Sequence, residues 1–216
     1  MELTKRIYNK RFSTELQFKN ELWDVLCTDF FQKYISEDAA VLDIGAGYCE
    51  FINNIKAKQK TALDINPDVN KFAAKDVKII ISESGSIKQI KDKTIDVVFA
   101  SNFFEHIPKK DIVRTIREMH RILKTEGKCL ILQPNFRYCH KDYWMFFDHI
   151  TPLDDRCMIE ILEVNGFEVI ECKPKFLPYS TKSNIPKSPL FIKLYLKLPI
   201  LQKMFGQQAF IYAKKI

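Results

Sequence analysis

A ten-residue segment, Val41–Glu50 with the sequence VLDIGAGYCE, limits the fold of this chain more than any other feature. An apolar run ends in an acid and then turns through two glycines, which is typical of a buried parallel strand that leads into a helix at a ligand-binding crevice. Gly45 and Gly47 permit a tight turn and let backbone N–H groups approach a ligand. Asp43 lies at the carboxyl end of the predicted strand, where its charge would repel a pyrophosphate and attract a cation.

A second acid follows the next predicted strand. Residues 61–65 include Asp64, which comes 21 residues after Asp43. Because the carboxyl ends of neighbouring parallel strands meet at one edge of a sheet, both acids are predicted at the same crevice. A carboxylate in the second position can accept hydrogen bonds from both hydroxyls of a ribose. The alternative is that Asp64 only helps to form a turn before Pro67.

The rest of the chain alternates predicted strands with amphipathic helices. Residues 15–35 carry an apolar residue at every fourth position and predict a helix. Further helices are predicted at about 49–57, 109–124 and 153–165, with Gly127 following the C-cap of the second of these. Strands are predicted at 40–44, 61–65, 77–81, 95–100, 128–133, 167–172 and 208–213. This alternation predicts an α/β fold, a three-layer α-β-α sandwich around a mostly parallel seven-stranded sheet.

These motifs resemble the pattern of one family. The Asp-x-Gly-x-Gly of residues 43–47 and the segment 96–108, an apolar strand followed by a Glu-His-x-Pro-like turn, are similar to motifs of the class I S-adenosylmethionine-dependent methyltransferases. The resemblance covers residues 39–135 and extends loosely to 172. It implies an antiparallel last strand and S-adenosylmethionine, a cation without phosphate, as the ligand. The positions that it assigns to this cofactor are Asp43, Gly45, Ala46, Gly47, Asp64, Ile65, Ser84, Asn102 and Phe103.

Two positions depart from the family's pattern. Cys49 replaces its third glycine, and Ser84 replaces an aspartate that often holds the adenine amino group. Cysteine is small and serine still forms hydrogen bonds, so neither change removes a chemical requirement. A nicotinamide dinucleotide is the rival ligand, but its Gly-x-Gly-x-x-Gly fingerprint needs a glycine where this chain has Glu50. The charges of Glu50 and Asp43 would both repel its pyrophosphate.

The resemblance also indicates where a catalytic base is expected, since a base helps when the attacked acceptor atom carries a proton. His149 lies in a segment, 148–153, that is similar to one covering the active site of many small-molecule methyltransferases, and it is predicted to be the base or to orient the acceptor. His106 is the second catalytic candidate. The alternative is that Glu105 and His106 only cap the next helix. No metal site is predicted, because the six cysteines are scattered without a Cys-x-x-Cys pair, which indicates reduced thiols.

The basic excess gathers at the C-terminal end. The net charge is +7, but residues 173–216 hold nine lysines and no acid, so the remaining 25 basic residues face 27 acids. Residues 188–205 alternate bulky apolar side chains with lysines, and Pro199 is predicted to kink or split their helix. Three interpretations stay open: a lid or packing over the core, contact with an anionic membrane surface or a lipid-linked substrate, and a contact between subunits. The sequence does not indicate the oligomeric state.

We expect one methyltransferase domain over 1–216, with a helical cap at 1–36, a cofactor-binding core at 37–173 and a basic apolar insertion at 174–206 between the last two strands. The predicted function is methyl transfer from S-adenosylmethionine to oxygen or nitrogen of a small molecule, such as a sugar or a lipid-linked glycan. A nucleic-acid methyltransferase is the first alternative, favoured by a pI near 9.0. Nucleic acid is nevertheless not the expected partner, because the lysines alternate with aliphatic rather than stacking aromatic residues.

A second alternative is a scaffold subunit that binds the cofactor without catalysis. Mutation of the two candidate histidines discriminates it from an enzyme, since a scaffold should tolerate both changes. The chain shows neither a secretory apolar region nor an apolar run of spanning length. A cytoplasmic protein is therefore expected, with peripheral contact at the inner face of the membrane through 188–205 as the open addition.

Overall fold

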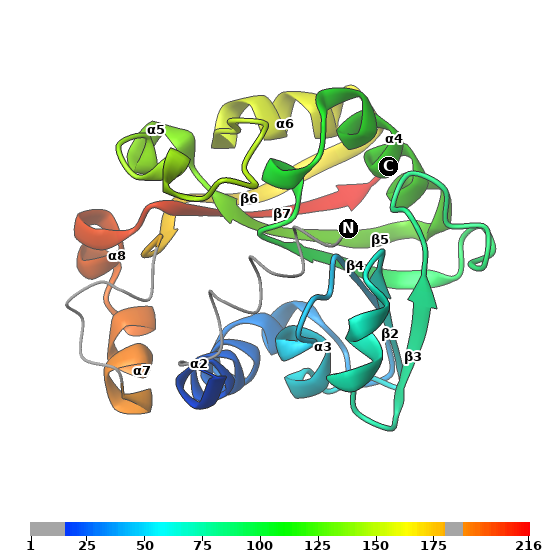
Figure 1. Ribbon diagram of the computed structural model, residues 1–216, viewed down its shortest axis with the longest axis horizontal. Coiled ribbons are helices and arrows are strands. Elements are labelled where there is room, and N and C mark those ends of the chain that lie inside the picture. The colour runs from blue at the N-terminus through cyan, green and yellow to red at the C-terminus, as the bar shows by residue number, and fades with distance from the viewer. Residues whose placement is uncertain (1–15, 180–187) are drawn as a thin grey trace.

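Seven strands form one sheet between two helical layers (Figure 1). The computed structural model describes residues 16–179 and 188–216, so the first part of the expected cap and part of the expected insertion lie outside the described residues. The strands are β1 (Ala40–Ile44), β2 (Gln59–Asp64), β3 (Val77–Ile81), β4 (Ile95–Ser101), β5 (Leu123–Pro134), β6 (Phe167–Leu177) and β7 (Gln208–Lys215). Their order is β3-β2-β1-β4-β5-β7-β6, and only β7 runs antiparallel to its neighbours. The predicted fold class is therefore confirmed.

Helices cover both faces of this sheet. One face packs against α2 (Leu16–Asp29), the short helix η1 (Phe31–Tyr34) and α3 (Glu50–Asn54), and the other packs against α4 (Lys109–Ile122) and α6 (Asp155–Glu163). The alternation of side chains along a strand supplies both cores: in β1, Val41 belongs to the first core, and Leu42 and Ile44 belong to the second. Further short helices are η2 (Pro67–Lys71), η3 (Phe104–His106), α5 (Phe136–Cys139), η4 (Tyr143–Met145), α7 (Pro189–Lys197) and α8 (Pro199–Phe205).

The first helix is shorter than its apolar pattern predicts. It ends at Asp29 instead of continuing to residue 35, and η1 follows. Phe30 leaves the helical conformation with φ −129°. The change of direction allows both Phe30 and Phe31 to be buried, although adjacent residues of one regular helix point about 100° apart. Aromatic packing therefore decides where this helix ends.

The prediction that Gly127 follows a helix C-cap is wrong. Helix α4 ends at Ile122 and the chain enters β5 directly at Leu123, which is fully buried and pairs with Ile95 of β4. Gly127 thus lies inside β5. Strand β6 also runs further than expected, to Leu177, because it pairs with β7 as far as Gln208.

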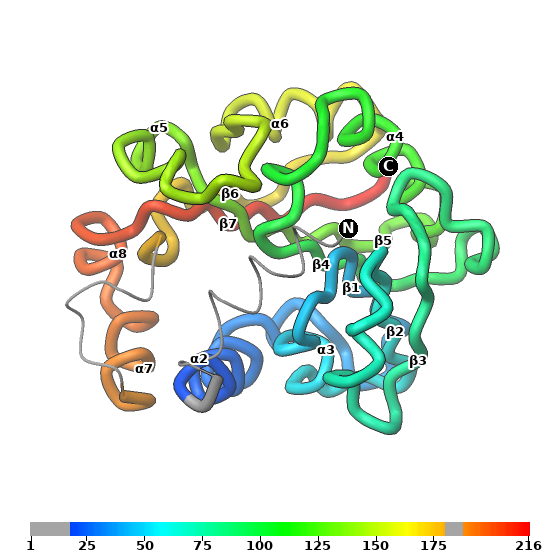
Figure 2. The backbone as a smooth tube through the Cα atoms, in the orientation of Figure 1, coloured from blue at the N-terminus to red at the C-terminus, as the bar shows by residue number. Residues whose placement is uncertain are grey.

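Helix α7, near the C-terminal end, lies beside the N-terminal helix α2. Pro199 begins α8 and separates it from α7, as predicted. In Figure 2, α7 lies next to α2, and Lys193 of α7 forms an ion pair of 3.6 Å with Asp29 at the end of α2. Within the described residues, each helix is too short or too polar to span a bilayer.

Candidate active site

The glycine-rich turn after β1 forms one wall of a pocket. Gly45 and Gly47 have φ angles of +70° and +51°, in the left-handed region that favours glycine. A Cβ atom on Gly45 would lie 2.5 Å from Cδ2 of Phe103, so only glycine fits beneath that ring. The pocket is lined by Lys19, Trp23, Asp43, Gly45, Ala46, Gly47, Tyr48, Glu50, Phe51, Phe99, Ser101 and Asn102. It thus combines the glycine-rich turn with residues of α2 and with the end of β4.

Asp64 connects the end of β2 with this turn. Its Oδ2 accepts a hydrogen bond from the N–H of Gly47 at 2.9 Å, and its Oδ1 accepts one from the N–H of Asn66 at 2.8 Å. Both bonds fix the orientation of the carboxylate, and each oxygen keeps a second lone pair for another donor. Ile65, the next residue, is 55% exposed although it is apolar. The two residues therefore offer fixed acceptors and an exposed apolar side chain next to the glycine-rich turn, although neither residue lines the pocket itself.

Asp43 is a buried acid among other acids. Burial, and then the charges of Glu50 and Asp64, raise its pKa well above the ordinary value. Burial also raises the pKa of Glu50, against which the charge of Lys19 acts. A cationic ligand in the pocket would relieve this repulsion, whereas a phosphate would add to it. The electrostatics therefore suit a ligand with a positive charge.

Asp43→Asn is expected to stabilise the protein without ligand by about 0.5–2 kcal/mol at neutral pH, because it removes a buried charge. The folded-state pKa of Asp43 is raised, so its carboxylate costs stability above the unfolded-state pKa of about 3.9. The advantage of the variant should shrink as the pH falls through the folded-state pKa and vanish near pH 4. Thermal melts of both proteins across this pH range measure it, and an advantage that grows toward low pH would contradict the assignment.

Cys49 occupies the place of the family's third glycine and adopts a backbone conformation that favours glycine. Its φ is +59°, in the left-handed region, at the N-cap of α3. The side chain is fully buried, and burial followed by the charges of Asp43 and Glu50 raises the pKa of its thiol to about 12. The position at a helix N-terminus therefore does not activate this thiol. Cys49 fills space behind the turn.

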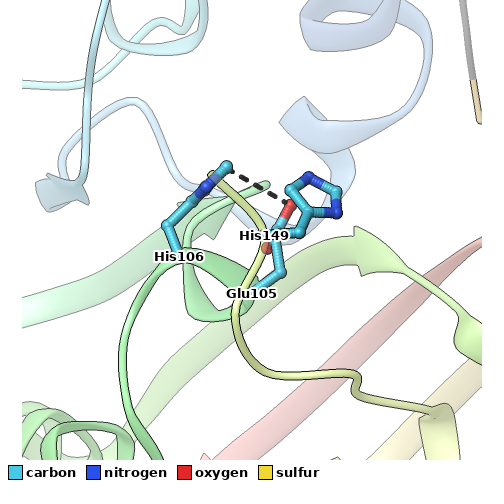
Figure 3. Close-up of side chains that lie close together, drawn as sticks. All are labelled: Glu105, His106 and His149. Carbon is cyan, nitrogen blue, oxygen red and sulfur yellow. Dashed lines mark ion pairs between the residues drawn. The ribbon is translucent and has the colours of Figure 1, made fainter. Parts of the chain in front are cut away.

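A second group of polar residues lies beyond the end of β4. Glu105, His106 and His149, here called the Glu–His cluster, place one ligand atom each within 4.8 Å of one another (Figure 3). The imidazole rings of the two histidines are 4.9 Å apart between centroids, and His106 Nε2 lies 3.9 Å from Glu105 Oε1. Both predicted catalytic histidines therefore meet at one place. Their meeting was not predictable from spacing, since 43 residues separate them.

Glu105 is the unexpected member of this cluster. Its side chain is buried, and among the described residues neither carboxylate oxygen has a hydrogen-bond partner. Burial raises the pKa of Glu105 to about 7, although the nearby His106 acts in the opposite direction. From the sequence, the role considered for Glu105 was capping of the next helix. Its carboxylate instead points to the two imidazoles (Figure 3).

Backbone hydrogen bonds hold the two segments of the cluster together. The carbonyl of Glu105 accepts the N–H groups of Ile150 and Thr151 at 2.9 and 3.1 Å. The Thr151 hydroxyl donates to the Ile107 carbonyl at 2.7 Å. His106 Nδ1 lies 3.0 Å from the carbonyl oxygen of Asp148, which can only accept, so Nδ1 carries the hydrogen. The cluster is thus a fixed arrangement, which a precise binding site requires.

The remaining predicted residues are placed in different ways. Asn102 lines the pocket with φ +47°, and Phe103 covers Gly45. Ser84 directs its hydroxyl to Thr115 of α4, 2.7 Å away. Lys19 and Trp23 of α2 line the pocket although sequence reasoning did not single them out, because a helical pattern shows which residues face inward but not which of them reach a ligand.

Comparisons with known proteins agree with this arrangement. Residues 42–131 match the profile of a family described as a methyltransferase domain. A solved S-adenosylmethionine-dependent methyltransferase of Archaeoglobus fulgidus shares the fold, with a TM-score of 0.71, 24% identity, and coverage of 94% of this chain and 99% of the other. The chain therefore contains a methyltransferase domain over residues 42–131 and has the fold of the S-adenosylmethionine-dependent methyltransferases. Such a domain implies S-adenosylmethionine as the cofactor.

Two curated relatives differ in how much they share with this chain. An uncharacterised protein of Methanocaldococcus jannaschii is 29% identical and aligns over 98% of this chain and 90% of its own length. A ubiquinone/menaquinone biosynthesis C-methyltransferase of Blochmanniella pennsylvanica is 28% identical over 43% of this chain and 36% of its own length. The similarity to the second protein thus covers less than half of either chain.

Proposed function

We propose that this methyltransferase transfers a methyl group from S-adenosylmethionine to oxygen or nitrogen of a small-molecule acceptor. The observation that carries the proposal is a pocket beside the glycine-rich turn that is lined by two acids, Asp43 and Glu50. The Glu–His cluster follows the end of β4, which also lines this pocket. The residues fit the cofactor, because a buried carboxylate with a raised pKa suits an ammonium and a sulfonium. When bound, the cofactor supplies an electrophilic methyl group, and S-adenosylhomocysteine is the second product of the transfer.

Each part of the pocket has a role in holding the cofactor. Asp43 and the backbone of Gly45–Gly47 would hold its amino acid part. Asp64 would accept both ribose hydroxyls, and the exposed side chain of Ile65 would cover one face of the adenine. Asn102 and Phe103 would border the methyl group, and Ser84 would lie near the adenine. Trp23 and Phe99 would exclude water from this side of the pocket.

The Glu–His cluster would prepare the acceptor. His149 and His106 orient the attacking atom and take up its proton, so that its lone pair becomes available to the methyl group. A well-placed acid–base group contributes typically about 10²–10⁴-fold in rate. Orientation of the two reactants contributes further, because a fixed geometry removes the entropy cost of a bimolecular encounter. Trp144 and Phe147, which are 57% and 79% exposed in the segment before His149, offer an aromatic surface for a sugar or a planar ring.

Calorimetric titration with S-adenosylmethionine and with S-adenosylhomocysteine tests the cofactor part of this function. We expect micromolar binding of both. An acceptor screen that starts with sugars and polyprenyl-linked glycans then tests the chemistry, with release of S-adenosylhomocysteine as the readout. A folded protein that binds neither cofactor form would overturn the proposal. The scaffold function would be favoured if the wild type binds the cofactor without turnover and if His106→Ala and His149→Ala bind it equally well.

We infer further that α7 and α8 touch an anionic lipid surface, where a lipid-linked acceptor would be presented. Both helices expose apolar side chains, among them Leu190 at 75%, Ile200 at 60% and Met204 at 64%. Lys193, Lys197 and Lys203 lie among them, without an acidic residue in either helix. A basic helix with exposed apolar residues is suited to lie in the interface of an anionic membrane.

Co-sedimentation with lipid vesicles tests this contact. We expect binding to vesicles with anionic lipid, weaker binding to zwitterionic vesicles, and a decrease as salt screens the lysines. Leu190→Ser combined with Leu194→Ser should lower the affinity about tenfold, because it removes apolar area that the lipid would bury. Val164→Ser, at a site that is 71% exposed after α6, is the matched control and should bind like the wild type. An equal loss of vesicle affinity in the double variant and in Val164→Ser would contradict the membrane contact.

A further inference from the structure

The Glu–His cluster has the composition and the arrangement of a metal site. Glu105, His106 and His149 offer one carboxylate and two imidazoles, and their ligand atoms all lie within 4.8 Å of one another. Two ligand atoms on one tetrahedral zinc ion lie about 3.4 Å apart, since each bond is about 2.1 Å long. Side-chain movements of less than about 1 Å would therefore bring the three groups to a common ion.

The buried carboxylate is the observation that points to a ligand. Glu105 is 1% exposed, and within residues 16–179 and 188–216 neither Oε1 nor Oε2 has a hydrogen-bond partner. A charge that is buried without a partner is costly, and proteins retain such a group where it serves catalysis or binds an ion. The neighbouring His106 provides only a contact of 3.9 Å to Oε1. A cation at the cluster would supply what this carboxylate lacks.

The surroundings of the histidines orient their nitrogens for metal binding. His106 donates from Nδ1 to the carbonyl of Asp148 at 3.0 Å, and the Asp148 carboxylate lies 3.4 Å away, so Nε2 carries the lone pair. On the other ring, Nδ1 of His149 lies 3.4 Å from the hydroxyl of Tyr179, which itself donates to the carbonyl of Tyr143 at 3.3 Å. A metal-binding histidine usually donates its second nitrogen in this way.

We propose that Glu105, His106 and His149 bind a divalent first-row transition metal ion. Two imidazoles and one carboxylate suit zinc, iron or manganese better than magnesium, which prefers oxygen ligands. Three protein ligands leave coordination positions open for another group. The inference deepens the proposed function: when bound, the ion would lower the pKa of a coordinated acceptor hydroxyl. The histidines would then hold the ion instead of taking up the proton. The acceptor hydroxyl would occupy an open position and release its proton to solvent, so that its oxygen can attack the methyl group.

The position of the cluster agrees with this role. Glu105 and His106 form η3, which follows Asn102 and Phe103 at the carboxyl end of β4. Asn102 lines the cofactor pocket, so the metal and the cofactor would bind in neighbouring places. An ion here would hold an acceptor oxygen near the methyl group without contacting the cofactor's own binding residues.

Titration of the protein, without an affinity tag, with Co²⁺ and then with competing Zn²⁺ tests the metal site directly. We expect one equivalent of Co²⁺ with visible d–d absorption and no sulfur-to-cobalt charge-transfer band, which excludes the cysteines as ligands. Glu105→Gln and His149→Gln should each weaken metal binding more than about 100-fold, since loss of a residue that only hydrogen-bonds to a metal ligand already costs about 10–100-fold. His140→Gln is the matched control, because His140 is exposed and lies outside the cluster.

Two further measurements keep the test decisive. Glu105→Gln removes an unpartnered buried charge, so its melting temperature without metal should equal or exceed that of the wild type, and lost binding then does not reflect unfolding. Titration of the same variants with S-adenosylmethionine should give wild-type affinity. If the wild type binds the cofactor but no metal, the metal site alone is overturned. The same holds if Glu105→Gln binds the metal as tightly as the wild type, or if His140→Gln loses as much metal affinity as Glu105→Gln. Absent cofactor binding with intact metal binding would overturn only the proposed function.

Discussion

Asp64→Ala is expected to lower the affinity for S-adenosylmethionine about 100-fold or more. The carboxylate at the end of β2 would accept two hydrogen bonds from the ribose, and a hydrogen bond to a charged group contributes about 1.5–3 kcal/mol. The loss also has an indirect part. Because Gly47 donates to Oδ2 of Asp64 at 2.9 Å, the glycine-rich turn loses a tie to the neighbouring strand. Calorimetric titration of the wild type and the variant measures the difference.

Two controls separate these effects. Asp64→Asn retains one acceptor oxygen and has the same shape, so its affinity should lie between those of the wild type and Asp64→Ala. Asp76→Ala removes an acid just before β3, at the amino ends of the parallel strands and thus away from the pocket. Its carboxylate pairs with Lys60 at 2.7 Å. Its affinity for the cofactor should equal that of the wild type. An unchanged affinity in Asp64→Ala would show that the ribose is held elsewhere.

Phe31→Ala should lower the free energy of unfolding by about 3–5 kcal/mol, the usual cost of deleting a fully buried aromatic ring. Phe31 in η1 is 0% exposed. Its ring meets Phe99 of β4 at 5.1 Å, Phe51 of α3 at 5.8 Å and Phe210 of β7 at 5.9 Å between centroids. One side chain therefore joins the N-terminal helical segment to three separate parts of the core.

Urea unfolding followed by circular dichroism measures this loss. Phe147→Ala is the matched control, because Phe147 is 79% exposed and its removal should change stability by less than about 0.5 kcal/mol. The effect of Phe31→Ala should reach the pocket too, since Phe51 and Phe99 line it. A loss below about 1 kcal/mol in Phe31→Ala would show that the helical segment is not anchored by this residue.

The core of the fold was predictable because its signals are local. The segments of β1 and β3 were predicted to the residue, since short β-branched and apolar runs bounded by turn residues leave few other structures open. The glycine-rich turn carried its own backbone requirement in its two glycines.

Errors arose where a distant partner decides the local structure. Gly127 suggested a helix end, but the pairing of Leu123 with Ile95 draws the chain into β5 four residues earlier. The end of β6 at Leu177 depends on β7, more than thirty residues later in the chain. Strand ends that depend on such pairing leave no mark in a local pattern.

The fold class, the glycine-rich turn and the two acids at neighbouring strand ends could be predicted from the sequence alone, because periodicity and backbone freedom act over a few residues. The meeting of Glu105 and His106 with His149 became evident only in the folded chain, as did the burial of a carboxylate that has no hydrogen-bond partner among the described residues. Burial and the distance between side chains are properties of the packed chain, which a local pattern does not contain. Two segments that are far apart in sequence acquire a common chemistry only when backbone hydrogen bonds, here from Ile150 and Thr151 to Glu105, fix them side by side.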